Sequence, residues 1–355
     1  MTENQQRIIR LSQGEILEKG ELAALLGSYT PEERQFAADL ARETATRQFG
    51  KQIYFRGLIE FTNYCKNDCL YCGIRRSNKN ASRYRMELSQ VLDCCRWGYS
   101  QGFRTFVLQG GEDPYFTDGR VVELVSAIKG EFPDCAVTLS IGEKSRESYR
   151  RFREAGADRY LLRHETASPD HYAKLHPPEL RLENRLRCLS DLKELGFQTG
   201  CGIMVGSPYQ TAENVAEDLL FMQKFRPQMI GIGPFIPHHD TPFRDRKPGT
   251  LEDTLFLLSI VRLMHPKVLL PATTALGTIS PGGPDALGGR QLGILAGANV
   301  VMPNLSPEDV RKNYLLYDNK IGSGGAPSGS VQKMREEAAA IGYEPVVSRG
   351  DYPED

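Results

Sequence analysis

Three cysteines within one short segment are the residues of this chain best suited to metal chemistry. Cys65, Cys69 and Cys72 follow the spacing C-x3-C-x2-C. Three thiolates in one loop can hold three irons of a [4Fe–4S] cube and leave the fourth iron without a protein ligand. An iron left open in this way can bind a small molecule, whereas a cluster for electron transfer is normally closed by four ligands. The spacing therefore predicts a cluster that takes part in chemistry.

Zinc and disulfide bonds are weaker interpretations of the same residues. A closed zinc site needs four ligands, and no fourth Cys or His follows nearby. Three cysteines cannot all pair in disulfides. Free buried thiols are the better interpretation of the other five cysteines, which are scattered: Cys94, Cys95, Cys135, Cys188 and Cys201.

Composition and charge exclude several classes of function. The 355 residues suit one large domain, and 44 basic residues nearly balance 45 acidic ones. This balance indicates neither nucleic acid nor an anionic membrane surface as a partner. We find no bilayer-spanning apolar run and no signal peptide. We therefore expect a cytoplasmic protein whose thiols stay reduced and available for metal.

Alternation of short apolar runs with longer amphipathic ones predicts an α/β fold. Eight strands, each followed by helix-like sequence, favour a (β/α)8 TIM barrel. The helical patterns include Leu88–Gln101, Arg120–Phe132, Leu182–Leu195, Ala212–Lys224 and Leu251–Met264. The predicted strands are Tyr54–Phe61, Thr105–Gln109, Ala136–Ile141, Arg159–Glu165, Thr199–Val205, Met229–Phe235, Val268–Thr273 and Asn299–Pro303.

Segments outside the barrel complete the predicted organisation. We expect an N-terminal helical extension (1–50) with two helices, the second starting at a capping box from Thr30 to Glu33. The barrel covers 51–310, and its last strand is followed by a helix capped by Ser306 with Pro at the first position. A C-terminal tail (311–355) closes the barrel with a loop at Ile321–Gly329 and a helix at Ser330–Gly342.

Polar and glycine-rich sequence falls at the predicted carboxyl end of every strand, where barrel enzymes gather their reactive groups. Glycines at Gly110 and Gly111 allow close approach of the backbone to a ligand. Arg163 and Glu165 are two apart on a strand and so share one face, with His164 on the other. An inward Arg can grip a carboxylate, and an inward Glu can accept from an ammonium or ribose hydroxyls. These groups suit an amino acid that carries a nucleoside, although Arg163 and Glu165 could instead form an internal ion pair that only fills the barrel.

Other polar groups remain open to two interpretations. His238, His239 and Asp240 could form a metal site, but a capped polar loop between prolines is the preferred interpretation. Tyr314 and Tyr317, after the last strand, either border the substrate cavity or are ordinary packing residues.

The cysteine spacing after the first strand, Tyr71 before the third cysteine, and Gly110-Gly111-Glu112 after the second strand resemble the radical S-adenosylmethionine (SAM) superfamily. The resemblance implies that Cys65, Cys69 and Cys72 hold a [4Fe–4S] cluster whose open iron binds SAM. It also implies one-electron cleavage of SAM to methionine and a 5′-deoxyadenosyl radical. The predicted SAM-binding residues are Tyr71, Gly110, Gly111, Glu112, Ser140, Arg163, Glu165, Arg185 and Met204. Arg185 could alternatively be a solvated helix arginine.

Longer runs resemble the HydE family of [FeFe]-hydrogenase maturases: Arg159–Ala167, Gly231–Pro242, Leu270–Thr278 and Val300–Asn304. This resemblance implies a role in assembling the two-iron precursor of the hydrogenase active site (the H-cluster). The implied substrate is a small organometallic iron complex made by the maturase HydG, with the scaffold HydF as a further partner. The electron donor is not indicated.

One departure from the family concerns the C-terminal segment. Several family members carry three further cysteines there for a second iron–sulfur cluster, but residues 314–328 contain none. We therefore expect a single cluster. The alternative function is a radical SAM enzyme of the biotin synthase or methylornithine synthase type that acts on an organic substrate. An electron carrier or a cluster scaffold fits less well, because neither needs a full barrel around the cluster.

Overall fold

Parallel strands form a barrel in the computed structural model, which describes residues 1–280, 286–321 and 327–353. Six strands pair in chain order from β2 to β7, and β8 pairs with β1, which leads directly into β2. Isolated bridges from Met229 to Leu269 and from Pro271 to Val300 close the ring between β7 and β8. The strands are β1 (Gln52–Phe55), β2 (Gly57–Thr62), β3 (Thr105–Gly110), β4 (Ala136–Ser140), β5 (Arg159–Leu161), β6 (Gln198–Val205), β7 (Met229–Pro234) and β8 (Val300–Val301).

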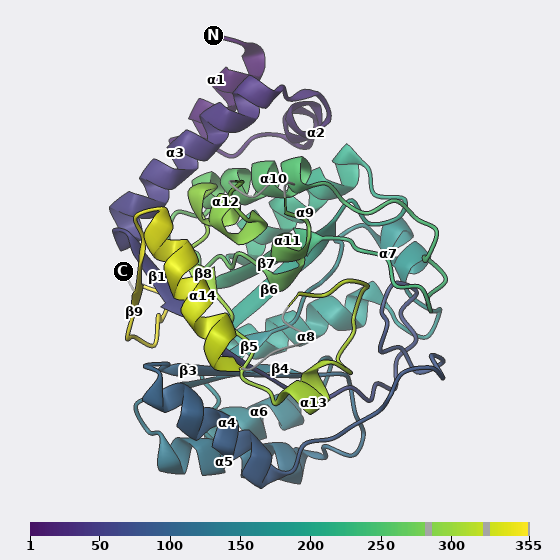
Figure 1. Cartoon of the computed structure of the whole chain (residues 1–355). Helices are drawn as coiled ribbons and strands as arrows, with labels where there is room; N and C mark the ends of the chain where they lie inside the picture. Colours follow the sequence, from purple (N-terminus) through teal and green to yellow (C-terminus); the bar gives the residue numbers. More distant parts are fainter. Residues whose placement is uncertain (281–285, 322–326, 354–355) are drawn as a thin grey trace.

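Helices surround this ring, as a parallel sheet buried on both faces requires (Figure 1). Every residue of β2 and of β7 is buried, and apolar helix faces pack on the outside of the strands. These helices are α4 (Leu88–Ser100), α5 (Asp118–Glu131), α6 (Arg146–Glu154), α7 (Pro169–Leu175), α8 (Leu182–Glu194), α9 (Ala212–Phe225), α10 (Leu251–Met264), α11 (Thr274–Thr278) and α12 (Gly289–Leu295). The (β/α)8 prediction is confirmed.

Three predicted strands are shorter than expected, and the first is divided at Arg56 into β1 and β2. The eighth, expected over Asn299–Pro303, is reduced to β8. The fourth was expected to reach Glu165, but β5 ends at Leu161 and only an isolated bridge from Glu165 to Ile203 follows. The seventh, expected over Val268–Thr273, pairs through isolated bridges alone. Pro271 cannot donate a hydrogen bond, which interrupts a regular ladder at this position. These segments nevertheless occupy their expected places in the ring.

Three helices, not the predicted two, precede the barrel: α1 (Glu3–Ser12), α2 (Lys19–Ser28) and α3 (Pro31–Phe49). The capping box is confirmed, since Thr30 Oγ1 accepts from Glu33 N at 3.2 Å and Thr30 N donates to Glu33 Oε2 at 2.9 Å. Gly20 and Gly27 weaken the helical pattern of α2, which explains the error. The three helices lie beside α9 and α10 (Figure 1).

The C-terminal segment packs along the barrel wall through α13 (Glu308–Arg311), α14 (Pro327–Ala340) and β9 (Glu344–Val346). Ser306 does not cap α13 as predicted. Its hydroxyl instead accepts from Glu60 N at 2.8 Å, so the cap position falls to Pro307. Most of the predicted loop at 321–329 lies outside the described residues. The predicted boundaries of the barrel at residues 50 and 310 stay a prediction.

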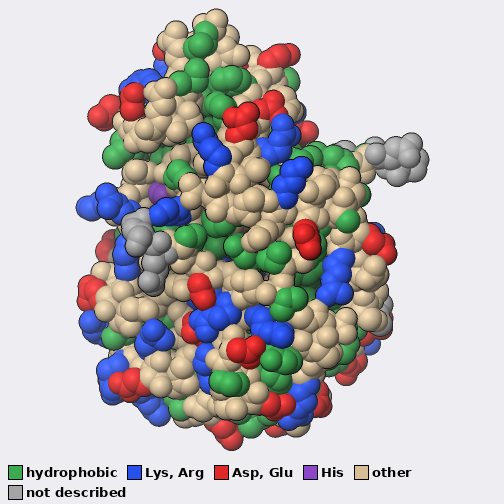
Figure 2. Space-filling view, turned by 90° about the vertical axis from the view of Figure 1, so that its left-hand side faces the viewer, with side chains coloured by type: hydrophobic (Ala, Val, Ile, Leu, Met, Phe, Trp, Pro, Cys, Tyr) green, Lys and Arg blue, Asp and Glu red, His purple; other side chains and the backbone are tan. Residues whose placement is uncertain are grey.

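The surface carries no large region of one charge on the face shown in Figure 2, where acidic and basic side chains are interspersed. Among the described residues, no helix has the length and apolar character needed to cross a membrane.

Candidate functional site

The cysteine loop leaves the barrel at the carboxyl end of β2, as predicted. Lys66 N donates to Glu112 O at 2.9 Å, which ties the loop to the segment after β3. Cys72 N donates to Cys69 O at 3.3 Å and closes a turn between the second and third cysteines. All three thiols are free and partly exposed. The loop therefore presents its sulfurs at the predicted mouth of the barrel.

The three thiols lie close enough to influence one another electrostatically. Burial, followed by the charge of the neighbouring Cys65, raises the pKa of Cys72 to about 12. Burial, followed by the charges of Cys72 and Cys65, also raises the pKa of Cys69. A bound cation would instead lower the pKa values of these thiols, because metal binds and stabilises the thiolate form.

The spacing of the three sulfurs argues against a single metal ion. Among the described residues, one group of three ligating side chains has all its ligand atoms within 4.8 Å, and the cysteines are not in it. Sulfurs on one tetrahedral zinc lie about 3.8 Å apart, given a Zn–S bond of about 2.3 Å. The wider spacing suits a cluster of several irons.

Glycines after β3 allow this segment to pack directly on the cysteine loop. A Cβ at Gly111 would lie 2.2 Å from Tyr64 O and 2.8 Å from the Cβ of Cys65. The buried Glu112 side chain accepts from Glu143 N at 2.9 Å, and its other oxygen lies 3.4 Å from Lys66 Nζ of the cysteine loop. It fits there because residue 142 is Gly142, where a Cβ would lie 2.0 Å from Glu112 Cγ. Glu112 thus supports the mouth through its neighbours.

Charged side chains after β5 meet at the same mouth. Arg163 Nη2 donates to Glu165 Oε2 at 2.9 Å, so the two side chains do share a face, and the buried His164 points the other way, toward α9. Arg163 Nε is buried and has no hydrogen-bond partner among the described residues. Arg185 is buried, not solvated, and donates to Glu143 Oε1 at 2.5 Å and to Arg163 O at 2.7 Å. The free donor on Arg163 is available to an anionic ligand.

An apolar wall lies beside these charges. Tyr71 and Leu70 pack against a buried group that contains Met204, from the end of β6, and Phe235, after β7. Ser140 is the last residue of β4 and pairs in register with Gln109 of β3. Together, polar and apolar groups from four strand ends surround the cysteine loop. Of the two tyrosines, Tyr314 is fully buried and Tyr317 partly buried.

The loop after β7 gathers a second polar group, formed by His238, His239 and Asp318. His239 Nδ1 lies 2.7 Å from Asp318 Oδ1, and His238 Nε2 lies 4.0 Å from the same oxygen. His238 Nδ1 accepts from Asp240 N at 3.1 Å, which leaves the ring proton on Nε2 and makes that nitrogen a poor metal ligand. These contacts agree with the preferred interpretation, a polar loop.

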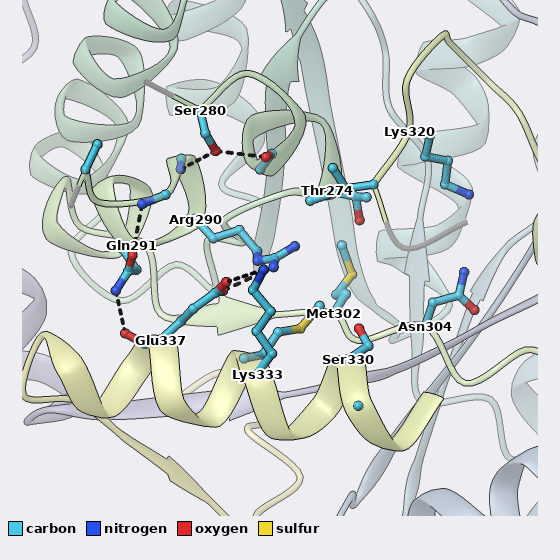
Figure 3. Close-up of a pocket in the computed structure, with 17 residues that line it drawn as sticks. Thr274, Ser280, Arg290, Gln291, Met302, Asn304, Lys320, Ser330, Lys333 and Glu337 are labelled. Carbon is cyan, nitrogen blue, oxygen red and sulfur yellow. Dashed lines mark hydrogen bonds and ion pairs between the residues drawn. The ribbon is translucent and has the colours of Figure 1, made fainter. Parts of the chain in front are cut away.

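A cavity of about 650 Å³ lies between α11, α12 and α14, where Asn304 and Lys320 also line it (Figure 3). Arg290 and Gln291 of α12 bond to Glu337 of α14 across it. None of its lining residues belongs to the predicted SAM site. Residues 281–285 and 322–326, which adjoin its lining, lie outside the described part of the chain.

Sequence reasoning missed residues that support the site. Glu143 holds Arg185, and His176 bonds to Tyr71, yet neither stands in a recognisable motif. Glu60 pairs with Lys320 at 2.5 Å and with Asn304 at 2.7 Å inside the barrel. Glu60 is the one charged residue of the buried strand β2, and this feature of the sequence could have predicted an internal ion pair.

Comparisons with known proteins agree with this geometry. The model of the radical SAM superfamily matches residues 59–222. The [FeFe] hydrogenase maturase subunit HydE of Thermotoga maritima is 48% identical over 282 residues, which cover 79% of this chain and 78% of that protein. The 3-methylornithine synthase of Methanosarcina acetivorans is 28% identical over 338 residues, covering 95% and 92%. The crystal structure of methylornithine synthase (PylB) superposes with a TM-score of 0.81 at 25% identity and covers 96% of this chain and 97% of that one.

Proposed function

Because this chain belongs to the radical SAM superfamily and, within it, to the HydE family of [FeFe]-hydrogenase maturases, we propose that it acts on SAM at the cysteine loop in assembly of the two-iron precursor of the hydrogenase active site. The observation that carries this proposal is the 48% identity to a maturase over most of both chains. Identity to the methylornithine synthase is lower, at 28%. The higher overall identity therefore favours the maturase over an enzyme with an organic substrate.

Cys65, Cys69 and Cys72 are the proposed ligands of a [4Fe–4S] cluster. Two observations support the fit: the three sulfurs do not all lie within 4.8 Å of one another, as one zinc ion would require, and burial followed by the neighbouring thiols raises the pKa of Cys69 and Cys72. When bound, such a cluster supplies the electron that cleaves SAM to methionine and a 5′-deoxyadenosyl radical. The chain contributes ligands on one loop and leaves the remaining iron to the co-substrate.

The surrounding residues would bind and orient SAM. Arg163 is proposed to donate its unpartnered Nε to the carboxylate, and Glu165 to accept from the ammonium or the ribose. The backbone of Gly111 lies against Tyr64 and Cys65, that of Gly110 lies against Thr62, and the two glycines would offer carbonyl acceptors. Tyr71 and Met204 would provide the apolar side of the pocket.

The proposed substrate is a small organometallic iron complex supplied by HydG, with HydF as the proposed acceptor. A single cluster is proposed, since Tyr314–Ser328 contains no cysteine. The pair of Glu60, on β2, and Lys320, from the C-terminal segment, would border the substrate space, because both are buried and Asn304, just after β8, also bonds to Glu60.

Reconstitution and complementation test the proposal together. Anaerobically reconstituted protein should hold about four irons per chain, and it should restore hydrogenase maturation in an extract that lacks only HydE. Cys65→Ala should abolish both, whereas the buried Cys201→Ala should retain both. Failure to complement, combined with SAM-dependent turnover of an organic substrate such as lysine, would discard the maturase and favour the alternative.

A further inference from the structure

The turn between the second and third cysteines is held from outside by the end of α7. Leu70 and Tyr71 are the two central residues of this turn. Leu70 N donates to Leu175 O at 3.0 Å, and Tyr71 Oη lies 3.2 Å from His176 Nε2. Two consecutive residues of one segment therefore hold both central residues of the turn.

The hydrogen bonds of His176 define its role. Its Nδ1 lies 3.0 Å from Tyr172 O, which can only accept, so Nδ1 carries the ring proton and Nε2 is free to accept from the Tyr71 hydroxyl. The ring stacks on Tyr172 at 3.9 Å and is 2% exposed. Burial lowers the pKa of His176 to about 3, so the ring stays neutral near pH 7. A neutral, stacked acceptor keeps the Tyr71 side chain in one orientation.

The segment from Arg163 to His176, which contains α7, also carries the charged residues of the proposed SAM site. Arg163 and Glu165 stand at its start, and the chain runs from them through α7 to His176. Glu165 has φ +66°, a strained value for a residue other than glycine. It is held by its N–H, which donates to Gly202 O at 3.0 Å, and by His164 next to it, whose Nδ1 accepts from Gly202 N at 3.3 Å.

Two further contacts attach this segment to the barrel. His164 Nε2 lies 3.3 Å from Asp218 Oδ1 of α9, and His171 Nε2 lies 3.0 Å from Pro208 O. Three of the six histidines in the chain thus lie within 164–176, and all three are buried. Both ends of a firmly attached segment reach the site, one at the charged pair and one at the cysteine turn.

We propose that His176 is a positioning residue for the radical SAM chemistry: by accepting from Tyr71 it fixes the Cys69–Cys72 turn relative to Arg163 and Glu165. This inference rests on the proposed function, because it assumes that the turn carries cluster ligands. Neither His176 nor Tyr71 Oη touches the reacting atoms in this assignment. His176 would contribute to SAM binding through geometry alone. One SAM molecule can contact both the turn and the charged pair only if the distance between them stays constant.

Matched variants at position 176 separate the acceptor from the ring. His176→Gln keeps an acceptor for Tyr71 and a donor for Tyr172 O, whereas His176→Phe keeps the stacking ring and removes the acceptor. Tyr71→Phe removes the donor, and Tyr71→Phe with His176→Phe removes both. His265→Phe is the control, because it alters a histidine at the end of α10, outside the segment that reaches the turn.

The measurements are SAM affinity, iron content, melting temperature, and the electron paramagnetic resonance spectrum of the reduced protein with and without SAM. His176→Phe and Tyr71→Phe should each weaken SAM binding about five- to tenfold, with near-parental iron content and an altered SAM-induced spectral change. The double variant should lose no more than either single one, since all three lack the same hydrogen bond. His176→Gln should recover near-parental affinity.

A lowered melting temperature with parental SAM affinity and spectrum in His176→Phe would overturn the inference, as would an equal affinity loss in His265→Phe. Parental protein that takes up no iron, or takes up iron but binds no SAM, would overturn the proposed function and this inference with it. The parental measurement comes first, so the two failures are distinguishable.

Discussion

The guanidinium of Arg163 keeps one hydrogen-bond donor that its internal ion pair does not use. Its Nη2 is paired with Glu165, yet its Nε stays buried without a partner among the described residues. A buried donor without a partner costs free energy, and a ligand carboxylate would satisfy it. The internal ion pair considered from the sequence is present, but it uses only part of this guanidinium.

Arg163→Gln should therefore weaken SAM binding about 10- to 100-fold, because a charge-assisted hydrogen bond contributes about 1.5–3 kcal/mol. Iron content should stay parental, since the side chain does not touch the thiols. The measurement is equilibrium binding of SAM to reconstituted protein. Arg150→Gln, on the exposed side of α6, is the matched control. Loss of folding with unchanged affinity in the folded fraction would show that the pair only fills the barrel.

At the scale of elements, the segment after β9 closes the amino end of the barrel. Arg159, at the start of β5, is fully buried. It donates to Arg349 O at 2.8 Å and to Asp351 Oδ1 at 2.5 Å. Arg56, after β1, donates to Gly350 O at 3.2 Å. The amino end of a barrel serves stability, and the catalytic groups lie at the other end.

Asp351→Asn should lower the free energy of unfolding by about 2 kcal/mol, because it leaves the buried Arg159 without its counter-charge. SAM affinity of the folded protein should not change, since the site lies at the opposite end of the strands. Urea denaturation and SAM binding check the two statements. Asp39→Asn, which breaks an exposed pair with Arg42, should cost almost nothing. Equal losses in both variants would contradict a special role for the C-terminal segment.

For the whole molecule, buried neutral histidines predict sensitivity to acid. Burial lowers the pKa of His176 to about 3 and that of His265 to about 4. Between these values and the unfolded pKa of about 6.5, the unfolded chain binds protons that the folded chain does not. Stability should therefore be greatest above pH 6.5 and fall as the pH falls.

His176 alone should cost about 2 kcal/mol between pH 6.5 and pH 5, at about 1.4 kcal/mol per pH unit. Urea denaturation of the metal-free protein at pH 7.5 and pH 5 measures the loss. His176→Gln should reduce the difference between the two pH values by about this amount. The exposed His239→Gln should keep the acid loss. An identical pH dependence in His176→Gln and the parent would contradict the assignment.

The amino-acid sequence by itself determined the barrel and the chemistry of its mouth. Strand and helix periodicity depends on local burial, so even the weakly paired seventh strand was placed correctly. The cysteine spacing and Gly110-Gly111 are contiguous motifs, and their meaning does not depend on distant residues. The capping box at Thr30 was predictable for the same reason, because all its hydrogen bonds join residues three apart.

Only the tertiary structure decided which distant side chains support that mouth. The bond between Tyr71 and His176 joins residues 105 apart in the chain, and the pair of Glu60 with Lys320 joins residues 260 apart. Ser306 shows the same limit, since its predicted cap was replaced by a bond to Glu60 of β2, a residue 246 positions away in the chain. Such contacts follow from packing geometry, because a side chain pairs with whichever partner the fold brings within about 3 Å. No local pattern encodes that choice.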